Sequence, residues 1–197
     1  MVGLEPTKDA EEVIMGGLAR LEYRGYDSAG IGLSTPGGIE IRKKSGKLAN
    51  LRADLQDNPL PQAIAGIGHT RWATHGGPTD INAHPHASSD GQLAVVHNGI
   101  IENADNLRRV LENQGFSFVS ETDTEVIANL LAASYLADEG ADTTLGEGEA
   151  EVPAPVLDKA QVSSKIASGA HLAAARLSRA LLKTMAQLKG TFTILAI

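Results

Sequence analysis

Two charged side chains, each next to an apolar segment, could together hold a small zwitterion. Arg71 lies in a glycine-rich stretch just after the apolar residues 63–68, and a guanidinium there can bind a carboxylate through two parallel hydrogen bonds. Asp123 lies just before an apolar helical segment and could bind an ammonium group. The pair therefore predicts a site that grips a free amino acid by its two ends. The alternative is that Arg71 forms a structural ion pair and Asp123 serves only the helix terminus.

The dipeptide Asn98-Gly99 offers two hydrogen-bond donors that add no bulk. It follows the short apolar run 93–96, which predicts a buried strand. A side-chain amide and a glycine N–H together suit an oxyanion hole, in which the loss of one donor costs a factor of about 10²–10³ in rate. An ordinary Asn-Gly turn is the alternative interpretation of these two residues.

Histidines are concentrated in the same part of the chain, since five of the six lie between His69 and His97. A metal site needs ligand types and spacings that this cluster lacks. The chain has no cysteine and no His-Glu-x-x-His motif, and a proline separates His84 from His86. We therefore expect no metal and no cofactor, and histidines that line a pocket.

Composition argues against several classes of function. The net charge of -7, with no Lys/Arg run between aromatic residues, argues against binding to nucleic acid. No apolar stretch approaches the roughly 20 residues that span a membrane, and the N-terminus carries no signal-peptide pattern. The 197 residues fit one domain or slightly more. These features predict a soluble cytoplasmic protein.

Helix and strand patterns alternate along the chain. Thr7 is expected to cap the first helix, and Thr122 and Glu125 have the spacing of a capping box before the third. Helices are expected in residues 10–21, 103–111, 122–131 and 177–188, and strands at 31–33, 39–42, 63–68, 93–96 and 190–197.

Residues 138–163 differ from the rest of the chain. Asp, Glu, Gly, Pro and Thr dominate this segment, which predicts a flexible, solvated acidic insertion. The chain ends inside the predicted strand 190–197. We therefore expect residues 1–197 to form one domain that lacks its C-terminal end.

Five segments taken together resemble one family closely. It is the N-terminal glutaminase domain of glutamine–fructose-6-phosphate aminotransferases, class II glutamine amidotransferases with an N-terminal nucleophile. The resemblance covers most of residues 8–137 in the same order. The segments that carry it are Leu-Glu-Tyr-Arg-Gly-Tyr-Asp-Ser-Ala-Gly at 21–30, Gly-His-Thr-Arg-Trp-Ala-Thr-His-Gly at 68–76, Asn-Ala-His-Pro-His at 82–86, His-Asn-Gly-Ile-Ile-Glu-Asn at 97–103 and Ser-Glu-Thr-Asp-Thr-Glu at 120–125.

The resemblance implies a fold and a set of roles. The fold is α+β, a four-layer αββα Ntn-hydrolase sandwich of two antiparallel sheets between helices. Arg71 would bind the α-carboxylate of L-glutamine and Asp123 its α-ammonium group, while Asn98 and the Gly99 N–H would form the oxyanion hole. The other implied site residues are Trp72, Thr74, His75 and His84, which would line a loop that closes over the ligand, and Arg24 and Gly25, which would position the nucleophile.

The implied reaction is the hydrolysis of L-glutamine to L-glutamate. The ammonia would pass to C-terminal sugar isomerase domains, which convert fructose 6-phosphate to glucosamine 6-phosphate. The family's nucleophile is an N-terminal cysteine, and this chain, which begins Met1-Val2-Gly3, contains none. We therefore expect an inactive part of such an enzyme, whose full-length form would be a homodimer. A nucleophile-less glutamine-binding or regulatory module and a histidine-based metal-binding protein are the alternatives.

Overall fold

The computed structural model describes residues 9–63, 65–138 and 170–197. In this part of the chain the strands form two antiparallel sheets, with the strand orders β2-β1-β3 and β4-β5-β6. The elements, in chain order, are α1 (Ala10–Leu21), the 3₁₀ helix η1 (Glu22–Arg24), β1 (Ser28–Thr35), β2 (Gly38–Ser45), α2 (Leu48–Asp57), β3 (Ala65–Arg71), β4 (His86–Ala87), β5 (Ala94–Ile101), α3 (Ala104–Asn113), α4 (Asp123–Ala137), α5 (Ala170–Gln187) and β6 (Gly190–Ala196).

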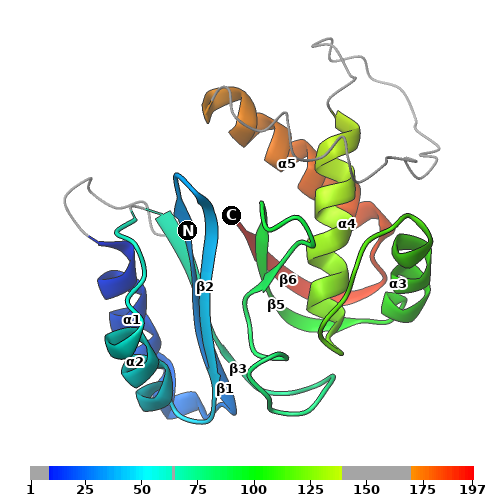
Figure 1. Ribbon diagram of the computed structural model, residues 1–197. Coiled ribbons are helices and arrows are strands. Elements are labelled where there is room, and N and C mark those ends of the chain that lie inside the picture. Colours follow the sequence, from blue (N-terminus) through cyan, green and yellow to red (C-terminus); the bar gives the residue numbers. More distant parts are fainter. Residues whose placement is uncertain (1–8, 64, 139–169) are drawn as a thin grey trace.

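The layers follow the order that the family resemblance implies. Figure 1 shows α1 and α2 outside the first sheet, the second sheet beside it, and α3, α4 and α5 beyond the second sheet. The two sheets meet through a small apolar cluster in which Ile67, Ala94 and Val96 are buried. This arrangement confirms the α+β four-layer αββα sandwich.

The first sheet is built around β1, whose residues Ser28 to Leu33 are buried. β1 and β2 form the expected hairpin, and β3 pairs along the other edge of β1. The helix α2 was not predicted, although its leucines, Leu48, Leu51 and Leu55, recur at helical spacing. All three are buried in the core beneath β1.

Two helix starts show how side chains satisfy free backbone N–H groups. The cap of α1 is Asp9, whose carboxylate accepts a hydrogen bond from the N–H of Glu11 at 3.1 Å. The expected cap, Thr7, lies outside the described residues. At α4 the Thr122 hydroxyl accepts from the N–H of Glu125 at 3.3 Å, as predicted.

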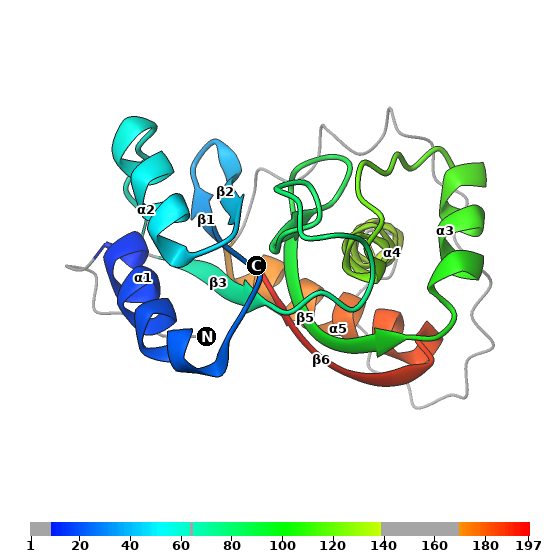
Figure 2. The same cartoon turned by 90° about the horizontal axis from the view of Figure 1, so that it is seen from below.

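The helix α4 lies at the centre of the second half of the molecule. Its residues Asp123 to Leu136 are all buried, and apolar side chains of α3, α5, β5 and β6 surround it. Figure 2 shows α4 end-on among these elements. Even so, none of the helices in the described ranges is both long and apolar enough to cross a membrane.

Asp138 corrects the prediction of a solvated segment at 138–163. It is buried, and its carboxylate accepts hydrogen bonds from Arg179 Nε at 2.8 Å and from Lys183 Nζ at 2.7 Å. Two cations of α5 therefore offset the cost of burying this charge and join the end of α4 to α5. Residues 139–163 lie outside the described part of the chain.

Candidate functional site

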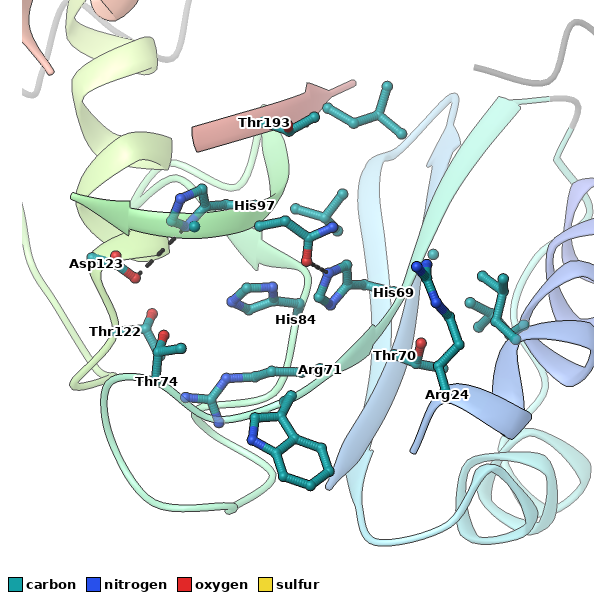
Figure 3. A pocket seen from close by; sticks show the side chains of 18 of the residues that line it. Arg24, His69, Thr70, Arg71, Thr74, His84, His97, Thr122, Asp123 and Thr193 are labelled. Carbon is teal, nitrogen blue, oxygen red and sulfur yellow. Dashed lines mark hydrogen bonds and ion pairs between the residues drawn. The ribbon is translucent and has the colours of Figure 1, made fainter. Parts of the chain in front are cut away.

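A cavity of about 540 Å³ lies where β3, β5 and the start of α4 meet. Figure 3 shows Thr122 and Asp123 on one side of it, Arg24 and Thr70 on the other, and His69 and His84 between them. Nine of the ten site residues that the sequence predicts line this cavity. They are Arg24, Gly25, Arg71, Trp72, Thr74, His84, Asn98, Gly99 and Asp123.

The tenth residue, His75, lines a smaller cavity of about 120 Å³ next to the first. Asp123 and Thr122 line both cavities, so they form the wall between them. His75 Nδ1 lies 3.8 Å from Asp123 Oδ2. The histidine therefore stands on the far side of the aspartate from the larger cavity.

Arg71 ends β3 and holds the loop that follows it. The guanidinium donates to the carbonyl oxygens of His75, of Gly76 at 3.2 Å and of Gly77 at 3.4 Å. An arginine has five N–H donors, so these contacts leave donors for a ligand. The nearest ion-pair partner, Asp27, is 4.0 Å away. The side chain thus shapes the loop and lines the cavity at once.

Asp123 is held in place by the neighbouring strand. Its Oδ2 accepts a hydrogen bond from the N–H of Ile101 at 3.0 Å, and its Oδ1 lies 3.7 Å from His97 Nδ1. A carboxylate offers about four acceptor positions, so capacity remains for an ammonium group. The first turn of α4 adds its positive end to the same place.

Asn98 and Gly99 lie inside β5, which corrects both the expected strand end at residue 96 and the turn interpretation. They pair with Thr193 and Phe192 of β6. A Cβ added to Gly99 would lie 2.0 Å from the carbonyl oxygen of Thr191, and the φ of Gly99 is 129°. Only glycine fits at this point.

The pairing of β5 also fixes the direction of the Gly99 N–H. Ala94 exchanges two hydrogen bonds with Ile197, so even-numbered residues of β5 direct their backbone groups toward β6. Odd-numbered residues direct theirs away, as the bond from the Ile101 N–H to Asp123 illustrates. The Gly99 N–H therefore faces the same side as Asp123, which is the direction that an oxyanion donor needs.

Trp72, Gly25 and Arg24 form the outer rim of the cavity. The Trp72 side chain is exposed, and an atom of its indole ring would lie 3.3 Å from a Cβ added to Gly25. Gly25 ends η1 with a φ of 73°, and Arg24 precedes it. A large exposed aromatic side chain next to a glycine therefore forms this rim.

Three histidines form a buried polar cluster at the wall of the cavity, which His84 and His97 line. Thr124 Oγ1 contacts His84 Nε2 at 2.9 Å and His97 Nδ1 at 3.1 Å, and Thr122 Oγ1 contacts His86 Nε2 at 3.0 Å. Burial lowers the pKa of each of these three imidazoles, so they are neutral at pH 7. Among the described residues, no three His, Asp or Glu side chains are placed to hold a metal ion.

Several contacts of the site could not be predicted from the sequence. Thr193 and Leu195 line the cavity because β6 pairs with β5, and that pairing has no local signal. Asp27 accepts a hydrogen bond from the N–H of Ala73 and so fixes the start of the loop after Arg71. The Asn82 amide donates to Gly77 at 3.1 Å and to Glu121 at 3.0 Å. It thereby joins the loops that carry the two charged ends of the site.

Several known proteins are similar in sequence to this chain. Residues 69–146 match the family described as glutamine amidotransferase domain. The chain carries a glutamine amidotransferase domain. The domain is 61% identical over 136 residues to a glutamine–fructose-6-phosphate aminotransferase (isomerizing) of Corynebacterium glutamicum. It is 58% identical over 137 residues to the enzyme of that name from Streptomyces coelicolor, and 54% identical over 138 residues to that of Thermus thermophilus.

The amidotransferase domain is shorter than these relatives. The match to the C. glutamicum protein covers 69% of this chain and 22% of the relative. The shares are 70% and 22% for S. coelicolor, and 70% and 23% for T. thermophilus. The matched part of the chain therefore spans less than a quarter of the length of these relatives.

Two solved structures share the fold of this amidotransferase domain. One is the glutamine phosphoribosylpyrophosphate amidotransferase of B. subtilis, with a TM-score of 0.60 and 24% identity over 96% of this chain and 33% of that one. The other is described as the allosteric regulatory enzyme of purine biosynthesis, with a TM-score of 0.61 and 24% identity over 94% and 32% of the two chains. At this identity the likeness concerns the fold alone.

Proposed function

We propose that this domain binds L-glutamine in the larger cavity. The observation that carries the proposal is the convergence of Arg71, Asp123 and Asn98-Gly99 on one cavity. Arg71 binds the α-carboxylate, Asp123 binds the α-ammonium group, and the donors of Asn98 and Gly99 point at the side-chain carbonyl. The protein is then the glutaminase part of an enzyme that supplies ammonia for the conversion of fructose 6-phosphate to glucosamine 6-phosphate.

The other expected roles belong to the same proposal. Trp72, Thr74 and His84 line the cavity around the bound amino acid, and His75 supports Asp123 from the far side. Arg24 and Gly25 position the attacking group. The ammonia acceptor is a sugar isomerase domain of the longer protein, which is a cytoplasmic homodimer. The names and the lengths of the relatives support the sugar isomerase domain of this extension.

Glutamine binding is tested by titration calorimetry of the 197-residue chain with millimolar L-glutamine. We expect heat from L-glutamine and none from N-acetyl-L-glutamine, which lacks the ammonium group, or from L-glutaminamide, which lacks the α-carboxylate. Asp123→Asn and Arg71→Lys should each weaken binding about ten-fold or more, because a hydrogen bond to a charged group contributes about 1.5–3 kcal/mol. Asp57→Asn and Arg52→Lys, on the exposed side of α2, serve as matched controls. Equal binding of L-glutamine and its N-acetyl derivative would contradict the proposal.

Hydrolysis is a separate question, because the sequence contains no cysteine. Without a thiolate, amide cleavage has no nucleophile of the expected kind. We therefore predict that the purified chain binds glutamine but releases no ammonia or glutamate in an overnight coupled assay. Release of ammonia or glutamate that increases with the concentration of the chain and disappears in the Asp123→Asn variant would show that another group attacks the amide.

A further inference from the structure

His69 makes one contact that the roles described so far do not explain. Its Nε2 lies 2.9 Å from Oδ1 of Asn98, while its Nδ1 is buried and has no hydrogen-bond partner among the described residues. His69 lies on β3 and Asn98 on β5, so the contact bridges the two sheets. In Figure 3 the dashed line that begins at His69 marks this hydrogen bond.

The chemistry of the contact fixes the tautomer of His69. An amide oxygen only accepts hydrogen bonds, so the proton of the ring must be on Nε2. The opposite tautomer would place an N–H on the buried Nδ1, where no acceptor lies within reach. A bare lone pair at that position costs less than an orphaned N–H. Burial also lowers the pKa of His69, as do the nearby His97 and Arg71, so the ring stays neutral at pH 7.

The tautomer in turn decides which end of the Asn98 amide is available to a ligand. With Oδ1 held by His69, the NH₂ group is the end that remains to face the cavity. If His69 carried its proton on Nδ1, it would accept from the NH₂ group instead. The Asn98 carbonyl oxygen would then face the ligand and would repel any oxygen that carries negative charge.

We propose that His69 is a positioning residue that sets the Asn98 amide as a hydrogen-bond donor and so selects ligands whose side chain ends in an acceptor oxygen. The inference rests on the proposed glutamine site and deepens it, because it names what the site reads at the far end of the ligand. L-Glutamine and L-glutamate both present such an oxygen. L-Norleucine has the same α-groups and a chain of similar length, but ends in a methyl group.

The tautomer is measured directly on the unmodified protein. Nitrogen-15 NMR of the histidine-labelled 197-residue chain distinguishes a protonated ring nitrogen from a bare one by its chemical shift. We expect a neutral His69 with its proton on Nε2 and a coupling across the hydrogen bond to Asn98. A proton on Nδ1, or a charged ring at pH 7, would overturn the proposal whatever the ligand results.

Selectivity is tested with two variants and two ligands. His69→Phe keeps a ring but has no donor, and His69→Gln keeps a donor that can reach Asn98. We expect His69→Phe to weaken the binding of L-glutamine about ten-fold, which is the effect of one lost hydrogen bond. The weak binding of L-norleucine should stay unchanged. His69→Gln should recover most of the loss, and thermal melts check that both variants fold.

The outcomes separate this inference from the proposed function. If His69→Phe weakens the binding of L-glutamine and of L-norleucine by the same factor, His69 only supports the fold. That result would overturn the inference. A wild type that binds neither amino acid would refute the glutamine site. In that case the NMR tautomer alone decides whether His69 orients Asn98.

Discussion

At the scale of single residues, Gly99 shows how one position can serve the fold and the site together. Its positive φ and the nearby Thr191 carbonyl leave no room for a side chain, and the same backbone geometry directs its N–H toward the Asp123 side. The sequence suggested the donor role of Gly99 but not the steric reason, because Thr191 is remote in the chain. A dipeptide that often forms turns is here part of a central strand.

Gly99→Ala should destabilise the protein by about 2–4 kcal/mol, because the new Cβ meets Thr191 and the backbone conformation is strained. Urea unfolding followed by circular dichroism measures the change. Gly16→Ala on α1 is the matched control, since its added Cβ would meet nothing within 4 Å. That control should be stabilised by about 0.5–1 kcal/mol. Equal effects at the two positions would contradict the steric explanation.

At the scale of elements, Lys43 on β2 holds the segment that carries His84. Its Nζ donates to the carbonyl oxygens of Ile81 at 2.9 Å, Ala83 at 2.8 Å and Pro85 at 3.1 Å. The same segment crosses β1 at Gly30, where an added Cβ would lie 2.2 Å from the His84 carbonyl. Lys43, which is half-buried, and Gly30 therefore hold the segment that carries His84, which lines the cavity, against the first sheet.

Lys43→Met should destabilise the fold by about 1–3 kcal/mol, because three carbonyl oxygens lose their shared donor. Lys47→Met, at an exposed position, should change little. Burial lowers the pKa of Lys43 to about 8, whereas the unfolded value is about 10.4. The folded state thus binds fewer protons between about pH 8 and 10, and wild type should gain stability relative to Lys43→Met as the pH rises through that range. If the free energies of unfolding of the two proteins change with pH in parallel, the lowered pKa of Lys43 is refuted.

At the scale of the whole molecule, the buried histidines make stability depend on pH. Burial lowers the pKa of His69, His84, His86 and His97 below the ordinary 6.5. Below pH 6.5 the unfolded chain therefore binds more protons than the folded one, and stability falls as the pH falls. Melting temperatures should drop between pH 7.5 and 5.5. His86→Phe should reduce the slope of melting temperature against pH, whatever the stability of the variant itself. An unchanged slope would contradict the prediction.

The sequence predicted the parts of this molecule that depend on local patterns. The charged and amide residues of the site stand in short motifs, and β1, β2, β5 and α4 follow apolar periodicity. What it could not supply were relations between distant segments, such as β6 beside β5, the Asn82 amide between two loops, and Asp138 buried by α5. The helix α2 is different, because the helical spacing of Leu48, Leu51 and Leu55 is itself a local pattern that indicates a helix.

The two sheets meet through only a small apolar cluster, while each half has an apolar core of its own. Arg71 belongs to the half built on β1, and Asp123 to the half built on α4. An amino acid that contacts both would therefore act as an additional cross-link between the halves. At a ligand concentration 100 times the dissociation constant, binding would add about 2.7 kcal/mol to the free energy of unfolding of the domain. Filling the site and keeping the halves together would then be a single equilibrium.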